Sequence, residues 1–240
     1  MATPGSSRLG FVPIPRTGLI GREAERGTAH ALLIDEGVPL LTFAGPGGVG
    51  KTRLALAITH DAVGHFDDGA VFVDLARIGD PSLVAPAVAR TLGMTEGGDQ
   101  SLVERLVIAL RRSHLLLVFD NCEHLLTAIA EAVSNLLAEC PRLQILATSR
   151  APLRIRGEQE LPIEPLPLPS VTLRHALDLA DNPAVQLFIE RARAARPDFQ
   201  LADSNAAVVA SRATSCWRTL GIVDAPGLNG RDGYSRCERP

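Results

Sequence analysis

LLTFAGPGGVGKT, residues 40–52, joins an apolar run rich in strand-forming residues to a glycine-rich turn. A second apolar segment, residues 54–58, follows the turn. The turn matches G-x-x-x-x-G-K-[ST] and stands between a predicted strand and a predicted helix, the setting in which this pattern binds phosphate. An ordinary glycine-rich loop is the alternative, but a chance match has odds on the order of one in a thousand. The stretch therefore predicts a nucleotide-phosphate site.

The residue types of this turn explain why it would hold phosphate. Glycines let successive backbone N–H groups point inward, and the N-terminus of the following helix adds its positive dipole end. Lys51 would reach the β- and γ-phosphates, and the Thr52 hydroxyl would coordinate Mg²⁺. Lys51 is also the only lysine among 24 basic residues, which suggests that a compact ammonium is needed here. The predicted phosphate-binding residues are Gly45, Pro46, Gly47, Gly48, Val49, Gly50, Lys51 and Thr52.

The composition sets the broad class of the protein. A chain of 240 residues can hold one α/β domain and part of a second. Hydrophobic content of 46% and charged content of 21% are typical of a soluble globular protein. The net charge of −3, the absence of a long apolar run and the lack of an apolar leader give no case for a membrane or nucleic-acid partner. The four cysteines form no C-x-x-C pair, so neither a disulfide nor a zinc framework is expected, and we expect a cytoplasmic protein.

Hydrophobic periodicity predicts an α/β fold, a parallel sheet sandwiched by helices, followed by the start of a small helical subdomain. Strands are expected from residue 38 to the turn and at 69–75, 114–120 and 143–150. Helices are expected at 19–36, after the turn, and near 82–92, 101–112 and 124–139, with a capping box formed by Ser101 and Glu104. A short edge strand from Leu161 runs into a proline-rich connector, read as a stiff linker or as a ligand of SH3 type. Shorter helices follow at 182–196 and near 203–210.

We divide the chain into four parts on this basis. Residues 1–17 form an extended lead-in, 18–169 the nucleotide-binding domain, 170–210 the start of the helical subdomain, and 211–240 an atypical tail without a fixed fold. The tail holds four glycines and Pro226, and its apolar residues never sustain helical spacing.

An acid at the end of a buried strand is the second candidate site residue. Residues 114–120 fit a parallel strand buried on both faces, and Asp120 stands at its carboxyl end, where open α/β sheets place ligands. Some 70 residues after the turn, Asp120 is predicted to hold Mg²⁺ together with Thr52. Taken alone, it would read equally well as the cap of the next helix. Glu123 could orient the attacking water or be an exposed first-turn glutamate, and Cys122 and His124 are interpreted as packing and helix-start residues.

The strand predicted at 143–150 ends in polar groups at the same sheet edge. Thr148 or Ser149 could sense the γ-phosphate through a hydrogen bond, and Arg150 through its charge. The alternative is an internally satisfied strand end followed by a solvated arginine.

Taken together, the ordered motifs resemble the NB-ARC-type ATPases of the STAND class (signal-transduction ATPases with numerous domains), as found in large bacterial regulators beside LuxR-type or winged-helix DNA-binding domains. The resemblance covers roughly residues 13–210. Its motifs are LIGRE at 19–23, the turn at 45–52, LLLVFDNCEHL at 115–125, ILATSRAPL at 145–153 and AVQLFIERARAARPDF at 184–199.

This resemblance implies a P-loop NTPase fold in which the 143–150 strand separates the strand of the turn from that of Asp120. It places Ile20, Gly21 and Arg22 near the adenine and makes Arg150 a sensor of the γ-phosphate. The implied ligands are ATP or ADP with Mg²⁺, and the implied role is a switch reset by slow hydrolysis. DNA would be bound only through domains absent from this chain, and nucleotide-dependent self-association is a further expectation.

Two departures from the family pattern matter. Asn121 follows Asp120 where many hydrolytic relatives have a second acid, so we expect slow turnover. The Gly-Leu-Pro-Leu-Ala motif that closes over adenine in the family does not follow residue 210, which suggests a truncated or frameshifted product, with a lineage-specific tail as the alternative. A non-functional remnant and a P-loop enzyme such as a small-molecule kinase are therefore the competing interpretations.

Overall fold

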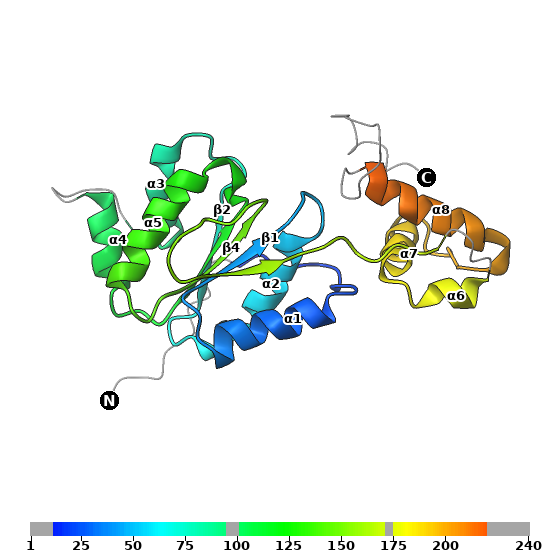
Figure 1. The fold of residues 1–240 in the computed structure, drawn as a ribbon, viewed down its shortest axis with the longest axis horizontal. Helices are drawn as coiled ribbons and strands as arrows, with labels where there is room; N and C mark the ends of the chain where they lie inside the picture. Colours follow the sequence, from blue (N-terminus) through cyan, green and yellow to red (C-terminus); the bar gives the residue numbers. More distant parts are fainter. Residues whose placement is uncertain (1–11, 95–100, 171–174, 220–240) are drawn as a thin grey trace. The chain divides into compact units, whose positions relative to one another are not determined.

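The computed structural model describes residues 12–94, 101–170 and 175–219, with side chains up to residue 215. The chain divides into two compact units, one of residues 1–45 and 50–163 and the other of residues 46–49 and 164–240. The first unit contains the sheet, and the second contains the helices that follow the proline-rich connector (Figure 1).

The first unit is built on a five-stranded sheet with the order β2-β3-β4-β1-β5. Every neighbouring pair is parallel. The strand β4 lies between β1 and β3, which confirms the order that the resemblance implied. The strands are β1 (Leu40–Ala44), β2 (Ala70–Asp74), β3 (Leu116–Asp120), β4 (Gln144–Ser149) and β5 (Glu158–Pro162).

Helices cover both faces of this sheet (Figure 1). The helix α2 packs on one face with α1 beside it, whereas α3, α4 and α5 pack together on the other. The helix α1 continues into a π-helical turn at Ala31–Asp35, and short 3₁₀ turns lie at Val63–His65, Pro81–Leu83 and Cys122–His124. The helices are α1 (Glu23–His30), α2 (Lys51–Ala62), α3 (Val84–Thr91), α4 (Leu102–Leu110) and α5 (Leu126–Glu139).

The central strands are buried on both faces, as their continuous apolar runs predict. Every residue of β3 and of β4 is buried. Leu117 and Phe119 belong to the core formed with α3, α4 and α5, and the alternating residues Leu116 and Val118 are fully buried on the opposite face. Because both faces are covered, polar groups of these strands can reach solvent only at the strand ends, and this concentrates the chemistry at the carboxyl edge.

Several local predictions are confirmed. Ser101 accepts a hydrogen bond from the Glu104 N–H, and the Glu104 carboxylate accepts one from the Ser101 N–H, which completes the capping box of α4. The edge strand after the central sheet exists, but it begins at Glu158 rather than at Leu161 and ends at Pro162, before the proline-rich connector. Residues 12–17 of the lead-in are irregular, and its residues 1–11 lie outside the described part. The helix predicted from residue 19 begins only at Glu23.

The second unit is a small helical cluster of α6 (Ala176–Ala180), α7 (Pro183–Ala195) and α8 (Asp203–Thr219). The Asn182 carboxamide caps α7 by accepting hydrogen bonds from the N–H groups of Ala184 and Val185. The core of the second unit is made of residues from all three helices. The rings of Phe188 and Phe199 are in edge contact beside this core. The core residues are Leu179, Val185, Ala206, Val209, Ala210 and Ala213.

Two predictions about this unit are wrong. The helix α6 was not predicted, and α8 runs to Thr219 rather than ending near Ala210. Residues 211–219 are therefore helical and not an unstructured tail. The reason is visible in the packing, because Ala213 and Thr214 are buried and so prolong the apolar face of α8 by one turn. Residues 220–240, the rest of the predicted tail, lie outside the described residues.

Candidate functional site

The glycine-rich turn links the carboxyl end of β1 to the first residue of α2. Gly50 caps α2 with φ 97°, and Gly48 has φ 84°, a region of backbone conformation that glycine adopts without strain. The backbone at Gly45 is crowded, because a Cβ atom there would overlap the carbonyl oxygen of Ile163 just after β5. These positions explain why the loop needs glycine at several places.

The first turn of α2 carries positive charge where a helix disfavours it. Lys51 and Arg53 both lie in this turn, and the turn contains no acidic residue. The N-terminus of a helix already bears the positive end of the macrodipole, so two cations there are unfavourable unless an anion is bound. The sequence of this turn therefore favours an anionic ligand such as a phosphate chain.

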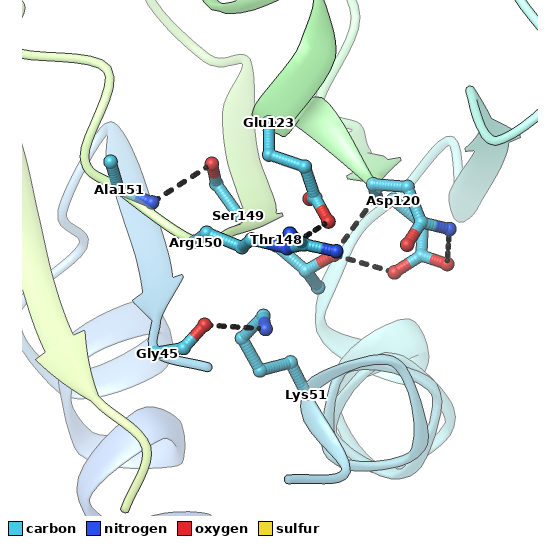
Figure 2. Close-up of polar contacts among 9 residues, drawn as sticks. Gly45, Lys51, Asp120, Glu123, Thr148, Ser149, Arg150 and Ala151 are labelled. Atoms are coloured by element: carbon cyan, nitrogen blue, oxygen red, sulfur yellow. Dashed lines mark hydrogen bonds and ion pairs between the residues drawn. The ribbon is translucent and has the colours of Figure 1, made fainter. Parts of the chain in front are cut away.

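The ammonium group of Lys51 lies over the turn that it follows. The residue is 8% exposed, and its Nζ donates a hydrogen bond of 2.7 Å to the carbonyl oxygen of Gly45 (Figure 2). Burial lowers the pKa of Lys51, an effect that the carboxylates of Glu123 and Asp120 oppose. A phosphate oxygen would be a stronger, charge-assisted acceptor for this ammonium than a neutral carbonyl.

Asp120 receives hydrogen bonds from three different side chains. Its Oδ1 accepts from the Thr52 hydroxyl at 2.8 Å and from the Thr148 hydroxyl at 2.6 Å. Its Oδ2 accepts from the Asn121 side-chain amide at 3.0 Å. Burial raises the pKa of Asp120, and the hydrogen bonds from Thr148 and Thr52 oppose that rise. The two residues predicted to hold Mg²⁺, far apart in sequence, are thus in direct contact.

These two residues fit a magnesium ion by their chemistry. Mg²⁺ prefers hard oxygen ligands and commonly takes one or two from the protein and the rest from phosphates and water. The Thr52 hydroxyl and the Asp120 carboxylate supply such a pair. Within the described residues no group of three or more His, Cys, Asp or Glu side chains could hold a metal ion.

Thr148 acts on Asp120 rather than on open space. It is 1% exposed, and its hydroxyl donates to Asp120 while accepting the backbone N–H of Asn121 at 3.0 Å. Ser149 is also buried, and its hydroxyl accepts the Ala151 N–H at 3.3 Å. The hydroxyls of Thr148 and Ser149 thus both have hydrogen-bond partners within the chain, and their predicted role toward the γ-phosphate stays a prediction.

Glu123 and Arg150 form an ion pair across the carboxyl edge of the sheet. The Arg150 Nε lies 3.2 Å from Glu123 Oε1, and Figure 2 shows the two side chains facing each other above Lys51. The other carboxylate oxygen, Oε2, is buried and has no hydrogen-bond partner in the described part of the chain. Both residues line a cavity of 480 Å³ together with Ala76, Asn121, His124, Leu126 and Ala151. This edge therefore has room for a ligand beside a carboxylate and a guanidinium.

Asn121 is a site residue whose role sequence reasoning missed. Its backbone has φ 65° and ψ 50°, a left-handed conformation that asparagine tolerates better than most residues. That turn lets its backbone N–H reach Thr148 while its side-chain amide reaches Asp120. The amide occupies an oxygen of Asp120 that a second acid at this position would have repelled.

The segment predicted to lie near the adenine approaches α2 through its backbone. Arg53 donates hydrogen bonds to the carbonyl oxygens of Thr17 and Gly18, and Gly21 turns the chain with φ 64°. Arg22 is 4% exposed and forms an ion pair with Glu25 of α1. The structure thus brings residues 17–18 to the first turn of α2, and the roles of Ile20, Gly21 and Arg22 stay predictions.

Cys122 and His124 behave as the sequence suggested. Cys122 is fully buried, its Sγ donates to the Phe119 carbonyl oxygen, and burial raises the pKa of its thiol. His124 hydrogen-bonds the Ile78 carbonyl oxygen through Nε2 at 2.8 Å. Both residues lie in the 3₁₀ turn after β3 and support local packing.

Residues 22–162 match the AAA domain family, and this match covers the whole of the sheet. The chain belongs to that family. The glycine-rich turn, the buried acid at the end of β3 and the parallel sheet agree with a P-loop domain of AAA type. No helix in the described ranges is both long enough and apolar enough to cross a membrane.

All three relatives described next are longer than this chain, and two of them are named as regulators. The chain is 41% identical over 183 residues to a Mycobacterium tuberculosis H37Rv protein provisionally named HTH-type transcriptional regulator Rv0890c, covering 76% of this chain and 19% of the relative. It is 36% identical over 206 residues to the uncharacterized protein Rv0894 of the same organism, covering 86% of this chain and 48% of that protein. It is 32% identical over 142 residues to the regulatory protein AfsR of Streptomyces griseus, covering 56% of this chain and 14% of AfsR. The chain therefore spans about half or less of each of these proteins.

Solved structures share the fold at low identity. The chain is similar to the STAND protein PH0952 of Pyrococcus horikoshii, which carries a tetratricopeptide repeat sensor, with a TM-score of 0.53 and 13% identity over 93% of this chain and 33% of that one. It is also similar to Cdc6p of Pyrobaculum aerophilum, with a TM-score of 0.51 and 15% identity over 77% of this chain and 52% of that one. These similarities support the P-loop NTPase fold.

Proposed function

We propose that the chain is the nucleotide-binding module of a transcriptional regulator, a switch that binds ATP or ADP with Mg²⁺ and hydrolyses ATP slowly. The observation that carries the proposal is the contact of the Thr52 hydroxyl with Asp120 at 2.8 Å, next to a lysine held over the glycine-rich turn. The names of two relatives, an HTH-type transcriptional regulator and AfsR, support the regulatory role. DNA would be bound through other domains of such proteins.

The chain's own residues divide the work of the site. Lys51 would exchange the Gly45 carbonyl for a phosphate oxygen, and the backbone N–H groups of the turn would hold the remaining phosphate charge. Thr52 and Asp120 would hold Mg²⁺, which when bound neutralises charge on the β- and γ-phosphates. Glu123 would orient the attacking water, and Arg150 would leave Glu123 to contact the γ-phosphate. While their ion pair is intact, Glu123 would not orient the water and Arg150 would not contact the γ-phosphate. Nucleotide binding would break the pair.

Calorimetric titration with Mg²⁺ and either ATP or ADP tests the binding site. Lys51→Ala removes charge-assisted hydrogen bonds worth about 1.5–3 kcal/mol, so affinity should fall roughly 10- to 150-fold. Arg142→Ala is the matched control, since it removes an exposed cation whose partner is Asp67. Equal affinities in the wild type and Lys51→Ala would contradict the assignment, and no binding by the wild type would favour a non-functional remnant.

Because the chain has a single lysine, a second experiment can test the contact between Lys51 and phosphate directly. Reductive ¹³C-methylation keeps the positive charge of a lysine, and in this chain it labels only Lys51 and the N-terminal amine. On adding Mg²⁺ and ATP, we expect the Lys51 methyl signal to shift while the N-terminal signal stays in place. A Lys51 signal unmoved by saturating nucleotide would show that the ammonium does not contact phosphate.

The switch itself needs a separate measurement. We propose that ATP and ADP hold the helical second unit in different arrangements and that the ATP form favours self-association. Small-angle X-ray scattering should then give different radii of gyration with ADP and with ATP in a Glu123→Gln background, which should slow turnover and leave Arg150 in place. Sedimentation velocity should show a larger species with ATP. Identical scattering and sedimentation in both states would leave a nucleotide-binding domain without a switch.

A further inference from the structure

One cation of the first helical turn, Arg53, adds to the positive charge of that turn but was given no direct contact with phosphate above. Arg53 directly follows Thr52 on α2, and neighbouring helical residues point about 100° apart. Thr52 faces Asp120, so Arg53 must face elsewhere. Its guanidinium Nη2 donates to the carbonyl oxygens of Thr17 at 2.6 Å and Gly18 at 2.9 Å. Within the described residues, no carboxylate forms an ion pair with Arg53.

The segment that Arg53 holds runs along α2 toward the phosphate end. His60, two turns further along α2, hydrogen-bonds the carbonyl oxygen of Pro13 at 3.1 Å. Pro13 therefore lies beside His60, and Thr17 and Gly18 lie beside Arg53, so the chain runs toward the N-terminus of α2. Gly21 then reverses the chain with φ 64°, and α1 returns beside α2, where Arg26 pairs with Asp61.

We propose that Arg53 is a positioning residue: it holds residues 17–18 against the first turn of α2 and so keeps the next residues, 20–22, which the family resemblance places near the adenine, beside the phosphate site. The proposal rests on the proposed function, because it assumes that phosphates bind at Lys51 and Thr52. A cation in the first turn of a helix is electrostatically unfavourable, and here its guanidinium is committed to two carbonyls of a distant segment. These hydrogen bonds can affect the affinity for a ligand only by positioning the segment that Arg53 holds.

The proposal predicts different effects of losing Arg53 on two ligands, ATP and inorganic tripolyphosphate. A direct contact of Arg53 with phosphate would affect both ligands alike. If Arg53 positions the nucleoside segment, its loss weakens binding of ATP but leaves inorganic tripolyphosphate unaffected. If Arg53 instead acts on phosphate by its charge, both ligands lose affinity together. If it only supports the fold, the loss appears in stability and in neither affinity ratio.

The experiment uses the full 240-residue chain and the variant Arg53→Met, which keeps an aliphatic stem for packing. Calorimetry with Mg²⁺ and either ATP or tripolyphosphate should show ATP affinity lower by about tenfold, the usual loss for a charge-assisted hydrogen bond, with tripolyphosphate within twofold of wild type. Arg26→Ala is the matched control, since it removes an ion pair between α1 and the far end of α2. It should leave both affinities within twofold.

Two results would overturn this role for Arg53: equal losses for both ligands, or no loss for either. If Arg53→Met does not fold by circular dichroism, Arg53→Lys repeats the test with a smaller expected loss of about threefold for ATP alone. Failure of the proposed function would look different, because the wild-type chain would then bind neither ATP nor tripolyphosphate.

Discussion

At the scale of single residues, the site is organised around the carboxylate of Asp120. Three neighbours donate to it, and two of them, Thr148 and Asn121, also satisfy each other through a backbone N–H. A buried carboxylate costs free energy unless such donors compensate for lost water. The hydroxyl of Thr148 therefore helps to fix the position of the carboxylate that we propose as a magnesium ligand.

Thr148→Val removes that hydroxyl with little change of shape. It leaves the Asn121 N–H without its acceptor and Asp120 Oδ1 with one donor fewer, so we expect a loss of about 1–3 kcal/mol in the free energy of unfolding. Urea denaturation measures it. Thr28→Val is the control, because the Thr28 hydroxyl donates only to the Ala24 carbonyl on the exposed side of α1. Equal stability of Thr148→Val and wild type would show that the network is not needed to hold Asp120.

Glu123→Gln tests the role of the other carboxylate at this edge. Removing its charge breaks the ion pair with Arg150 and its influence on a water, so the rate of phosphate release should fall at least about tenfold from a wild-type value below about 1 s⁻¹. ATP affinity should stay within about threefold, because Glu123 carries no phosphate contact. Arg150→Ala should lower the rate as well. Glu131→Gln, an exposed glutamate on α5, should change nothing, and an unchanged rate in Glu123→Gln would return Glu123 to a helix-start role.

At the scale of elements, sequence reasoning located most of the fold for a physical reason. Short apolar runs such as residues 114–120 fit strands buried inside a doubly covered sheet, and a glycine-rich turn after such a run fixes where α2 begins. The bounds of β5 and α8 were wrong because weakly patterned segments are decided by tertiary partners. Glu158–Pro162 becomes a strand through its pairing with β1, and Ala213 becomes buried only against the other helices of its unit.

The candidate site was predictable in part for the same reason. Lys51, Thr52 and Asp120 stand in local patterns whose geometry follows from strand–turn–helix order. By contrast, the hydrogen bond from the Asn121 side-chain amide to Asp120 depends on a particular backbone conformation. The hydrogen bonds of Arg53 depend on a segment about 35 residues away. No local sequence pattern encodes either feature.

Gly45→Ala tests how closely β5 and the turn are fitted together. An added Cβ would overlap the Ile163 carbonyl oxygen, while the Ile163 N–H donates to Ala44 at 2.7 Å, so the end of β5 would have to move. We expect a loss of about 1–3 kcal/mol in the free energy of unfolding, together with weaker nucleotide binding. Gly27→Ala in α1 is the control with the opposite sign. Nothing lies near its added methyl, so it should stabilise by about 0.5–1 kcal/mol. Destabilisation by both would contradict this account.

At the scale of the whole molecule, two units with separate cores share one chain. The first buries a sheet between helices, and the second buries a small set of side chains from α6, α7 and α8. A small core is marginal, because little apolar surface offsets the conformational entropy of ordering the chain. Each buried residue of the second unit should therefore contribute a large share of that unit's stability. This contribution can be measured by substitutions in the last turns of α8.

Ala213→Asp places a charge in that second core. Ala213 is 1% exposed, and an unpaired carboxylate there should cost at least about 2 kcal/mol, enough to unfold the second unit early. Thermal unfolding by calorimetry should show its transition moved down or lost. Ser211→Asp is the matched control, because it adds the same charge to an exposed position two residues earlier on α8. If the two variants unfold alike, α8 beyond residue 210 adds nothing to the core, and the unstructured tail expected from composition would begin there after all.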